Sequence, residues 1–272
     1  MRTALTIAGS DSGGGAGIQA DLKTFAALGV YGTSAITAVT AQNTIGVTAC
    51  APLPADLVTA QIEAVAGDIQ VHATKVGMLA NAAIVEAVVA AIEELELPLV
   101  VVDPVMVSKG GQRLLDEDGV QALGAELLPL ARVVTPNLPE AEALSGRRIQ
   151  SLSDARDAAR RIQEMGARAV IITGGHGTRA PNPELIVDLL LDGDAYYEFR
   201  TKRIDTKNTH GTGCTFASAV AAHLALGRAL PDAAERAQQY VVGAIAHALA
   251  IGHGHGPLDH FWQTRTTSSR EG

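Results

Sequence analysis

Residues 209–214 read THGTGC and stand directly before an apolar stretch that should form a helix. Gly211 and Gly213 allow a tight turn whose successive N–H groups point toward one spot, and the helix adds its positive end. Such a turn suits the charge that develops on a phosphoryl group during transfer. Cys214, in the first helical turn, is expected to have a lowered thiol pKa and to accept a proton from an attacking hydroxyl. The alternative is a glycine-rich helix entry that buries a small cysteine.

A second glycine-rich loop, residues 9–17 (GSDSGGGAG), joins the first expected strand to the first expected helix. Gly15, Gly17 and Ala20 resemble a dinucleotide fingerprint, which also requires an acidic residue roughly 20 positions later. The corresponding strand ends in AVTAQ (38–42) without an acid, so a nicotinamide dinucleotide is disfavoured. A loop that closes over a small substrate is preferred, and a mobile loop without a ligand is the alternative.

Acidic and amide side chains follow two further expected strands. Asn137 and Glu140 stand three positions apart at the start of a short helix, and Asp103 ends the most hydrophobic strand. Carboxylate and amide oxygens suit a hydrated Mg²⁺ that shares phosphate oxygens, so Asp103 and Glu140 are candidate metal ligands. The alternatives are a helix cap made by Asn137 with Glu140, and a strand-end acid bonded to loop amides.

Gln42 and Met78 follow expected strands and suit a flat heterocycle. An amide can hydrogen-bond to the edge of a ring, and a methionine can lie against its face, although Met78 also fits a core position. The run GHGHGP at 252–257 has two histidines without a third nearby ligand, so a glycine turn is favoured over a metal site. The sequence contains no GxxxxGK[ST] phosphate loop, no HExxH and no GxSxG.

The bulk composition narrows the class of protein. The chain has 272 residues, 47% hydrophobic content, 3% aromatic content and a formal net charge of -8. An acidic protein is a poor partner for nucleic acid or anionic membranes, although backbone amides can still bind a phosphate. Two cysteines, Cys50 and Cys214, favour a reducing compartment, and no apolar run reaches the roughly 18 residues of a membrane span. We expect a soluble, cytoplasmic protein with no nucleic-acid or membrane partner.

Short apolar segments alternate with helical patterns along the chain. Strands are expected at 4–8, 34–40, 74–76, 99–102, 132–135 and 169–173, with a hairpin of 185–191 and 196–202; helices are expected at 17–28, 54–65, 80–95, 116–128, 153–165, 215–226 and 232–251. This order predicts an α/β fold with a central, mostly parallel sheet and helices on both faces. One domain is expected over residues 1–262, followed by a polar tail over 263–272. In such sheets, ligands bind beyond the carboxyl ends of the strands, where the loops described above fall.

Taken in order, these loops resemble those of the hydroxymethylpyrimidine and hydroxymethylpyrimidine-phosphate kinases of the ribokinase superfamily. The matching stretches are AGSD (8–11), GGAGIQAD (14–21), AQNT (41–44), KVGML (75–79), DPVM (103–106), TPNLPEA (135–141), GGH (174–176), KNTHGTGC (207–214) and GHGHGP (252–257). The resemblance implies a ribokinase-like fold, ATP and Mg²⁺, and a homodimer. It also implies two successive phosphorylations of 4-amino-5-hydroxymethyl-2-methylpyrimidine in thiamine biosynthesis.

The resemblance also assigns roles to single residues. The catalytic group would be Cys214 with Gly211 and Gly213. The substrate pocket would contain Gln42, Asp21, Met78, Gly9, Val105 and His210. The nucleotide would contact Asn137, Glu140, Thr173, Gly175 and Thr212, and Asp103 with Glu140 would hold Mg²⁺.

Two positions depart from the family pattern. Thr173 and Gln238 stand where family members usually have lysine, so phosphate binding is expected to be weaker, and Lys109 is hypothesised to compensate. A pyridoxal kinase is the nearest alternative, because pyridoxal is also a flat ring with a hydroxymethyl group. A non-catalytic pyrimidine-binding regulator is the alternative from another class.

Overall fold

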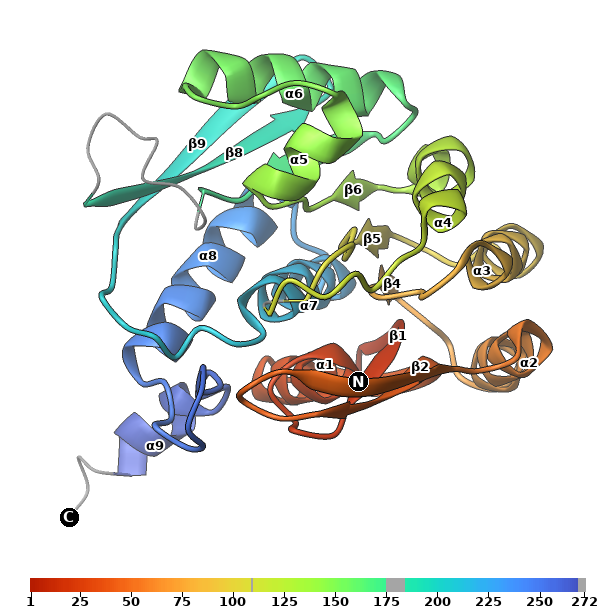
Figure 1. Cartoon of the computed structure of the whole chain (residues 1–272), viewed down its shortest axis with the longest axis horizontal. Coiled ribbons are helices and arrows are strands. Elements are labelled where there is room, and N and C mark those ends of the chain that lie inside the picture. The colour runs from red at the N-terminus through yellow and green to blue at the C-terminus, as the bar shows by residue number, and fades with distance from the viewer. Residues whose placement is uncertain (109, 175–183, 269–272) are drawn as a thin grey trace.

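Alternating strands and helices form a nine-stranded sheet within residues 1–108, 110–174 and 184–268, the parts of the chain that the computed structural model describes. The strand order is β3-β2-β1-β4-β5-β6-β7-β8-β9 (Figure 1). The strands are β1 (Thr3–Asp11), β2 (Tyr31–Gln42), β3 (Val47–Pro52), β4 (Ala73–Val76), β5 (Val100–Val102), β6 (Val133–Val134), β7 (Ala169–Ile172), β8 (Leu185–Asp192) and β9 (Ala195–Lys202).

The sheet is mostly parallel, as the alternation of segments predicts. The strands from β2 to β7 in the sheet order pair in parallel, whereas β3, β8 and β9 join through antiparallel pairs. Side chains alternate between the two faces: Val100 and Val102 join one buried cluster, and Val101 joins the other. Because both faces are covered, the short central strands contain almost only small apolar residues.

Helices cover both faces of the sheet. They are α1 (Gly17–Ala27), α2 (Ala55–Ala66), α3 (Ala82–Glu94), α4 (Glu117–Ala122), α5 (Leu138–Ser145), α6 (Leu152–Glu164), α7 (Thr212–Ala225), α8 (Leu230–Ala246) and α9 (Trp262–Ser268). The apolar residues of α2, α3, α5 and α6 pack in one core cluster, and those of α1, α7 and α8 pack in the other. The layers on the two sides of the sheet are visible in Figure 1.

Several boundaries differ from the expected ones. Strand β3 was not predicted: it lies at the sheet edge with mostly exposed side chains, so it lacks the alternation that marks a half-buried strand. In place of the single helix expected over 116–128, α4 is followed by a π-helical turn at Leu123–Leu127 and a 3₁₀ turn at Leu128–Leu130. Helix α6 begins at Leu152, one residue earlier than expected, and is capped by Ser151, whose side chain accepts from Asp154 N.

The C-terminal part also departs from expectation. Helix α7 begins at Thr212, three residues earlier than expected, and α8 ends at Ala246. The short helix α9 (Trp262–Ser268) lies where a polar tail was expected. The division into one domain over 1–262 and a tail stays a prediction. No helix in the described ranges combines the length and the apolar character of a membrane span.

The topology brings the predicted loops to one edge of the sheet. Strands β1, β2, β4, β5, β6 and β7 end there with Asp11, Gln42, Val76, Val102, Val134 and Ile172. Because parallel strands share one direction, the polar residues that follow these ends gather on the same side of the sheet. Helix α7 begins beside this edge and contacts β1, β4 and β5.

Candidate active site

The turn at residues 211–214 opens helix α7 and is accessible from outside. Gly211 is the N-cap with φ 83°, a left-handed conformation that favours glycine. A Cβ on Gly211 would collide with the carbonyl oxygen of Gly15, so this turn packs backbone to backbone against the loop at 9–17. Gly213 is exposed, and Thr212 and Cys214 are half-buried. The first N–H groups of α7, which have no carbonyl partner within a helix, are therefore placed to bind an anion.

The thiol of Cys214 lies among charged side chains. Its S–H donates a hydrogen bond to Asp103, and the amide of Gly17 donates to Sγ. Burial raises the pKa of the Cys214 thiol to about 12; the ammonium group of Lys75 opposes this rise, and the carboxylates of Asp103 and Asp21 add to it. The expectation of a lowered thiol pKa is therefore wrong, because burial and carboxylates contributed by other elements outweigh the helix start.

Asp103 directly follows β5, and it forms a buried acidic pair with Glu140 in the first turn of α5. Burial raises the pKa of Asp103 to about 6 although Lys75 lowers it, and burial with the Asp103 charge raises the pKa of Glu140 to about 8. Asp103 Oδ2 is buried, and among the described residues no group donates a hydrogen bond to it. Two mutually repelling carboxylates with an unpaired oxygen fit a divalent cation.

A metal at this pair would need further ligands from outside the protein. Within the described ranges, no group of three or more His, Cys, Asp or Glu side chains is arranged to hold a metal ion. Mg²⁺ tolerates such a site because it keeps several waters and shares phosphate oxygens. The acidic pair therefore fits Mg²⁺ that arrives with a nucleotide better than a permanently bound metal.

Asn137 caps helix α5, so the capping interpretation is confirmed. Asn137 Oδ1 accepts from Glu140 N at 3.0 Å, and Glu140 Oε2 accepts from Asn137 N at 3.0 Å. The amide of Met106 also donates to Glu140. Asn137 and Glu140 do converge, as expected, but the side-chain oxygen of Asn137 is occupied by the cap.

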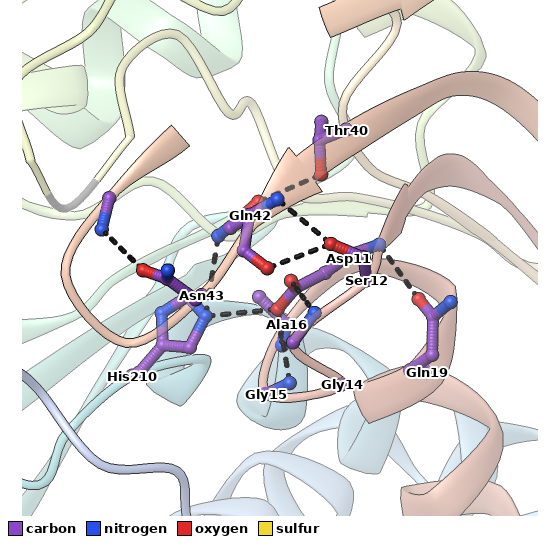
Figure 2. Close-up of polar contacts among 12 residues, drawn as sticks. Asp11, Ser12, Gly14, Gly15, Ala16, Gln19, Thr40, Gln42, Asn43 and His210 are labelled. Carbon is purple, nitrogen blue, oxygen red and sulfur yellow. Dashed lines mark hydrogen bonds and ion pairs between the residues drawn. The ribbon is translucent and has the colours of Figure 1, made fainter. Parts of the chain in front are cut away.

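The glycine-rich loop after β1 folds around the carboxylate of Asp11 (Figure 2). Oδ1 accepts from Gly13 N at 2.8 Å, and Oδ2 accepts from Gly15 N at 3.0 Å and Ala16 N at 2.8 Å. Burial opposes the charge of Asp11, but His210 and these amides outweigh it and lower the pKa of the carboxyl. Sequence reasoning gave Asp11 no role, although an aspartate just before a glycine run is a known signal for this kind of turn.

Gln42 and His210, both expected in the substrate pocket, lie together beside Asp11 (Figure 2). His210 Nε2 lies 3.0 Å from Asp11 Oδ2 and 3.3 Å from Gln42 Nε2, and Thr40 Oγ1 donates to Gln42 Oε1 at 3.0 Å. Gln42 is half-buried, which leaves part of its amide open to a ligand. The structure therefore brings the end of β2 and the start of α7 to one place.

Met78 and Gly9 are a second pair of expected pocket residues that lie together. Met78 is only 8% exposed, and a Cβ on Gly9 would lie 3.1 Å from its Sδ. Most of the Met78 side chain is therefore packed in the core, as the alternative interpretation predicts. Val105 is half-buried in the segment after β5, where its N–H donates to Asp103 O at 2.8 Å.

Asp21 does not line the pocket, and this expectation is wrong. Asp21 is completely buried, and its oxygens accept from Thr6 Oγ1 at 2.6 Å, Ser218 Oγ at 2.7 Å and Lys75 Nζ at 3.0 Å. No oxygen is left open to a substrate. Asp21 instead holds Lys75, a buried lysine that the sequence analysis did not single out.

The end of β7 forms the side where the nucleotide was expected. Thr173 bridges Asn137 in parallel, and Gly174 N donates to Asp188 Oδ1 at 2.8 Å. Gln238 Nε2 donates to Asp188 Oδ2 at 2.8 Å, so Gln238 faces a buried carboxylate. Thr212 Oγ1 donates to Thr209 O at 2.8 Å. Gly175 and Lys109 lie outside the described residues, so their expected roles stay predictions, as does weaker phosphate binding.

The histidine-containing segment 252–257 forms a turn that ties two loops together, as the glycine-turn interpretation predicts. His255 N donates to Thr44 O at 2.8 Å, and Gly254 N donates to Thr44 Oγ1 at 3.2 Å. Gly256 O accepts from His210 N at 3.2 Å. The segment therefore links the loop after Gln42 to the turn before α7.

The chain is similar to known kinases in sequence and in structure. The family model described as phosphomethylpyrimidine kinase matches residues 11–259. A hydroxymethylpyrimidine/phosphomethylpyrimidine kinase of Haemophilus influenzae is 49% identical over 97% of this chain and 98% of its own. Its counterpart in Bacillus subtilis is 51% identical over 95% of this chain and 94% of its own. The ADP complex of Bacillus subtilis pyridoxal kinase superimposes with a TM-score of 0.88 at 40% identity, covering 97% of this chain and 99% of that one.

Proposed function

Because the chain belongs to the phosphomethylpyrimidine kinase family, we propose that it phosphorylates 4-amino-5-hydroxymethyl-2-methylpyrimidine and then its monophosphate, in thiamine biosynthesis. The chain is a phosphotransferase with a ribokinase-like α/β fold. ATP is the proposed phosphoryl donor, which fits the ADP complex of the similar pyridoxal kinase.

The observation that carries the proposal is the accessible turn at 211–214 beside an acidic pair and a polar pocket. The turn offers helix N–H groups to a phosphate, and Asp103 lies close enough that a Cβ on Gly213 would be 3.8 Å from Oδ1. On its other side, the turn packs backbone to backbone against the loop at 9–17. His210 directly precedes the turn and contacts Gln42. This arrangement supports the proposal that a phosphate site and a site for the ring of the substrate adjoin.

In the proposed reaction, the ring of the substrate lies beside Gln42 with its hydroxymethyl oxygen toward Sγ of Cys214. The thiolate of Cys214 takes the hydroxyl proton, and the hydroxyl oxygen forms a bond to the γ-phosphorus of ATP. The bond from this phosphorus to the bridging oxygen breaks and ADP leaves, while the amides at the start of α7 hold the transferring phosphoryl group. Gly17 N–H and Lys75 favour the thiolate, and burial opposes it. Asp103 and Glu140 would hold Mg²⁺, which when bound supplies positive charge to the phosphates.

The raised thiol pKa makes a specific prediction for pH dependence. Because the base acts only when deprotonated and its pKa lies far above neutrality, kcat/KM for the pyrimidine should rise with pH from about 6 to about 9 without a plateau. Initial rates at saturating ATP and Mg²⁺ measure this profile.

At subsaturating Mg²⁺, Glu140 adds a second rising limb near pH 8, because its carboxyl must lose its proton before it can hold a cation, whereas a bound cation lowers this pKa. The variant Cys214→Asp separates the two contributions. Its base is a carboxyl group, so the rise of kcat/KM caused by the thiol disappears and the rise caused by Glu140 remains. A parent profile that is flat over this range would contradict the assignment of the base.

A competition assay tests the substrate. Pyridoxal and the pyrimidine alcohol are supplied together with ATP and Mg²⁺, and their phosphorylated products are quantified separately. We expect kcat/KM for the pyrimidine to exceed that for pyridoxal. A higher kcat/KM for pyridoxal would favour the pyridoxal kinase alternative, which is considered because the fold is similar to that of a pyridoxal kinase. A chain that binds the pyrimidine but releases no ADP would be the non-catalytic regulator.

A homodimer, Mg²⁺ dependence and a cytoplasmic location are also part of the proposal. Cys50 and Cys214 are both free thiols, which accords with a reducing compartment. The mass of the chain in solution, measured by light scattering, tests the dimer.

A further inference from the structure

A lysine side chain is buried beneath the candidate active site. Lys75 on β4 is completely buried, and its Nζ lies 3.0 Å from Oδ2 of Asp21, which is equally buried. Hydroxyl groups of Thr6 and Ser218 complete the hydrogen bonds of Asp21. Taking two charges out of water costs free energy that their attraction seldom exceeds, so stability alone does not account for such a pair.

The ammonium group of Lys75 extends toward the edge of the sheet where the site lies. A Cβ on Gly77 would lie 2.5 Å from Nζ, so the side chain runs along β4 past Val76 to the level of Gly77. In the parallel ladder Val76 pairs with Val102, and Asp103 N donates to Val76 O at 2.8 Å. The lysine charge is therefore next to the end of β5, where Asp103 stands.

Helix α7 connects the same pair to Cys214. Ser218, which donates to Asp21 Oδ1 at 2.7 Å, follows Cys214 by one helical turn and so lies on the same face of α7. Burial opposes the charge of Lys75, but Asp21, Cys214 and Asp103 together hold the pKa of its ammonium group above the ordinary value. Lys75 is thus a fixed cation that acts on both Cys214 and Asp103.

We propose that Lys75 is a positioning residue for phosphoryl transfer, which acts through Cys214 and Asp103 without touching the substrate. Its fixed positive charge stabilises the thiolate of Cys214, the form that can accept the proton of the acceptor hydroxyl, against the repulsion of the nearby carboxylates of Asp103 and Asp21. Asp21, Thr6 and Ser218 hold the ammonium group in place. The inference rests on the proposed function, because it requires a hydroxyl acceptor.

Two variants test this role. Lys75→Met alone leaves the Asp21 carboxylate buried without its partner, and this variant is expected to lose stability as well as turnover. The double variant Asp21→Asn/Lys75→Met removes both charges, so its fold should be retained. Arg132→Met/Asp192→Asn is the matched control, because it removes a 3.0 Å ion pair that is remote from the site.

We expect the double variant to unfold within a few degrees of the parent and to keep KM for the pyrimidine within about threefold. We expect kcat to fall about tenfold, because Lys75 acts on Cys214 more strongly than the Asp21 carboxylate, which opposes it. The control should keep the kcat of the parent. A purely structural role would leave kcat unchanged once the fold is retained. A double variant with kcat within about threefold of the parent would overturn the proposal. A double variant that does not fold would also overturn it, because the pair would then serve the fold.

The parent chain separates this inference from the proposed function. A parent that releases no ADP with the pyrimidine overturns the proposed function, and the role of Lys75 with it. When the parent is active, the result for the double variant bears on Lys75 alone.

Discussion

Replacing Cys214 by serine is expected to lower kcat by about 10³-fold, while the affinity for the pyrimidine stays close to that of the parent. A serine hydroxyl is a much weaker acid than a thiol, so it supplies almost no base at neutral pH. In the proposed complex the ring is held by Gln42 and its neighbours, which the substitution does not touch. Stopped assays for kcat and calorimetric titration for pyrimidine affinity measure the two effects.

Cys214→Asp is the matched variant for this substitution. A carboxylate can accept the proton that serine cannot, so we expect at least tenfold more turnover than in Cys214→Ser. It will stay below the parent, because a third carboxylate beside Asp103 and Asp21 is destabilising. Parent-like kcat in Cys214→Ser would exclude the thiol as the base.

Replacing Gly211 by alanine is expected to damage both stability and turnover. The left-handed φ of 83° costs a non-glycine residue about 1–2 kcal/mol, and the added Cβ would collide with the carbonyl oxygen of Gly15. Relief of this collision requires the turn to separate from the loop at 9–17. We expect the melting temperature to fall by about 10 °C and kcat by at least about 10²-fold.

Gly146→Ala isolates the backbone contribution. Gly146 ends α5 with φ 64°, and no atom lies within 4 Å of the position that a Cβ would occupy, so alanine there introduces the unfavourable φ without a collision. Its stability should fall slightly and its kcat should not change. If kcat of Gly211→Ala is unchanged, as expected for Gly146→Ala, the close approach of the turn at 211–214 to the loop at 9–17 does not contribute to turnover.

The order of the strands and helices could be predicted because each buried element carries its own pattern. Strands β5 and β7 are short apolar runs, and α1 and α3 show apolar residues at helical spacing. Strand β3 has almost no buried side chain and therefore no such pattern. The hairpin of β8 and β9 was predicted from a turn-forming pair, and Asp192 pairs with Ala195 across it.

The site could be predicted in outline but not in its electrostatics. Strand-end loops indicated where Gln42, Asp103, Glu140 and Cys214 would gather. Whether a charged side chain is buried depends on partners far away in sequence: Asp21 meets Lys75 and Ser218, which are 54 and 197 residues away. For the same reason a local argument from the start of α7 gave the wrong direction for the thiol pKa.

The sequence around Lys75 contains one signal that could have predicted a buried lysine. The sequence ATKV places one charged residue in a four-residue strand that is otherwise apolar or neutral, and a lysine is by default expected to reach water. Only the packing of α7 over β4, together with the ion pair to Asp21 of α1, reveals that this lysine has no route to solvent. A lone charge within a buried-strand pattern therefore indicates that an acidic partner lies elsewhere in the chain.

The most direct test of the account is to follow the products when the pyrimidine alcohol is incubated with the full chain, ATP and Mg²⁺. Phosphorus NMR distinguishes the monophosphate, the diphosphate and ADP in one sample. We predict that the monophosphate forms first and is converted to the diphosphate, with one ADP released at each step. ADP release no greater than in a sample without pyrimidine would contradict the account.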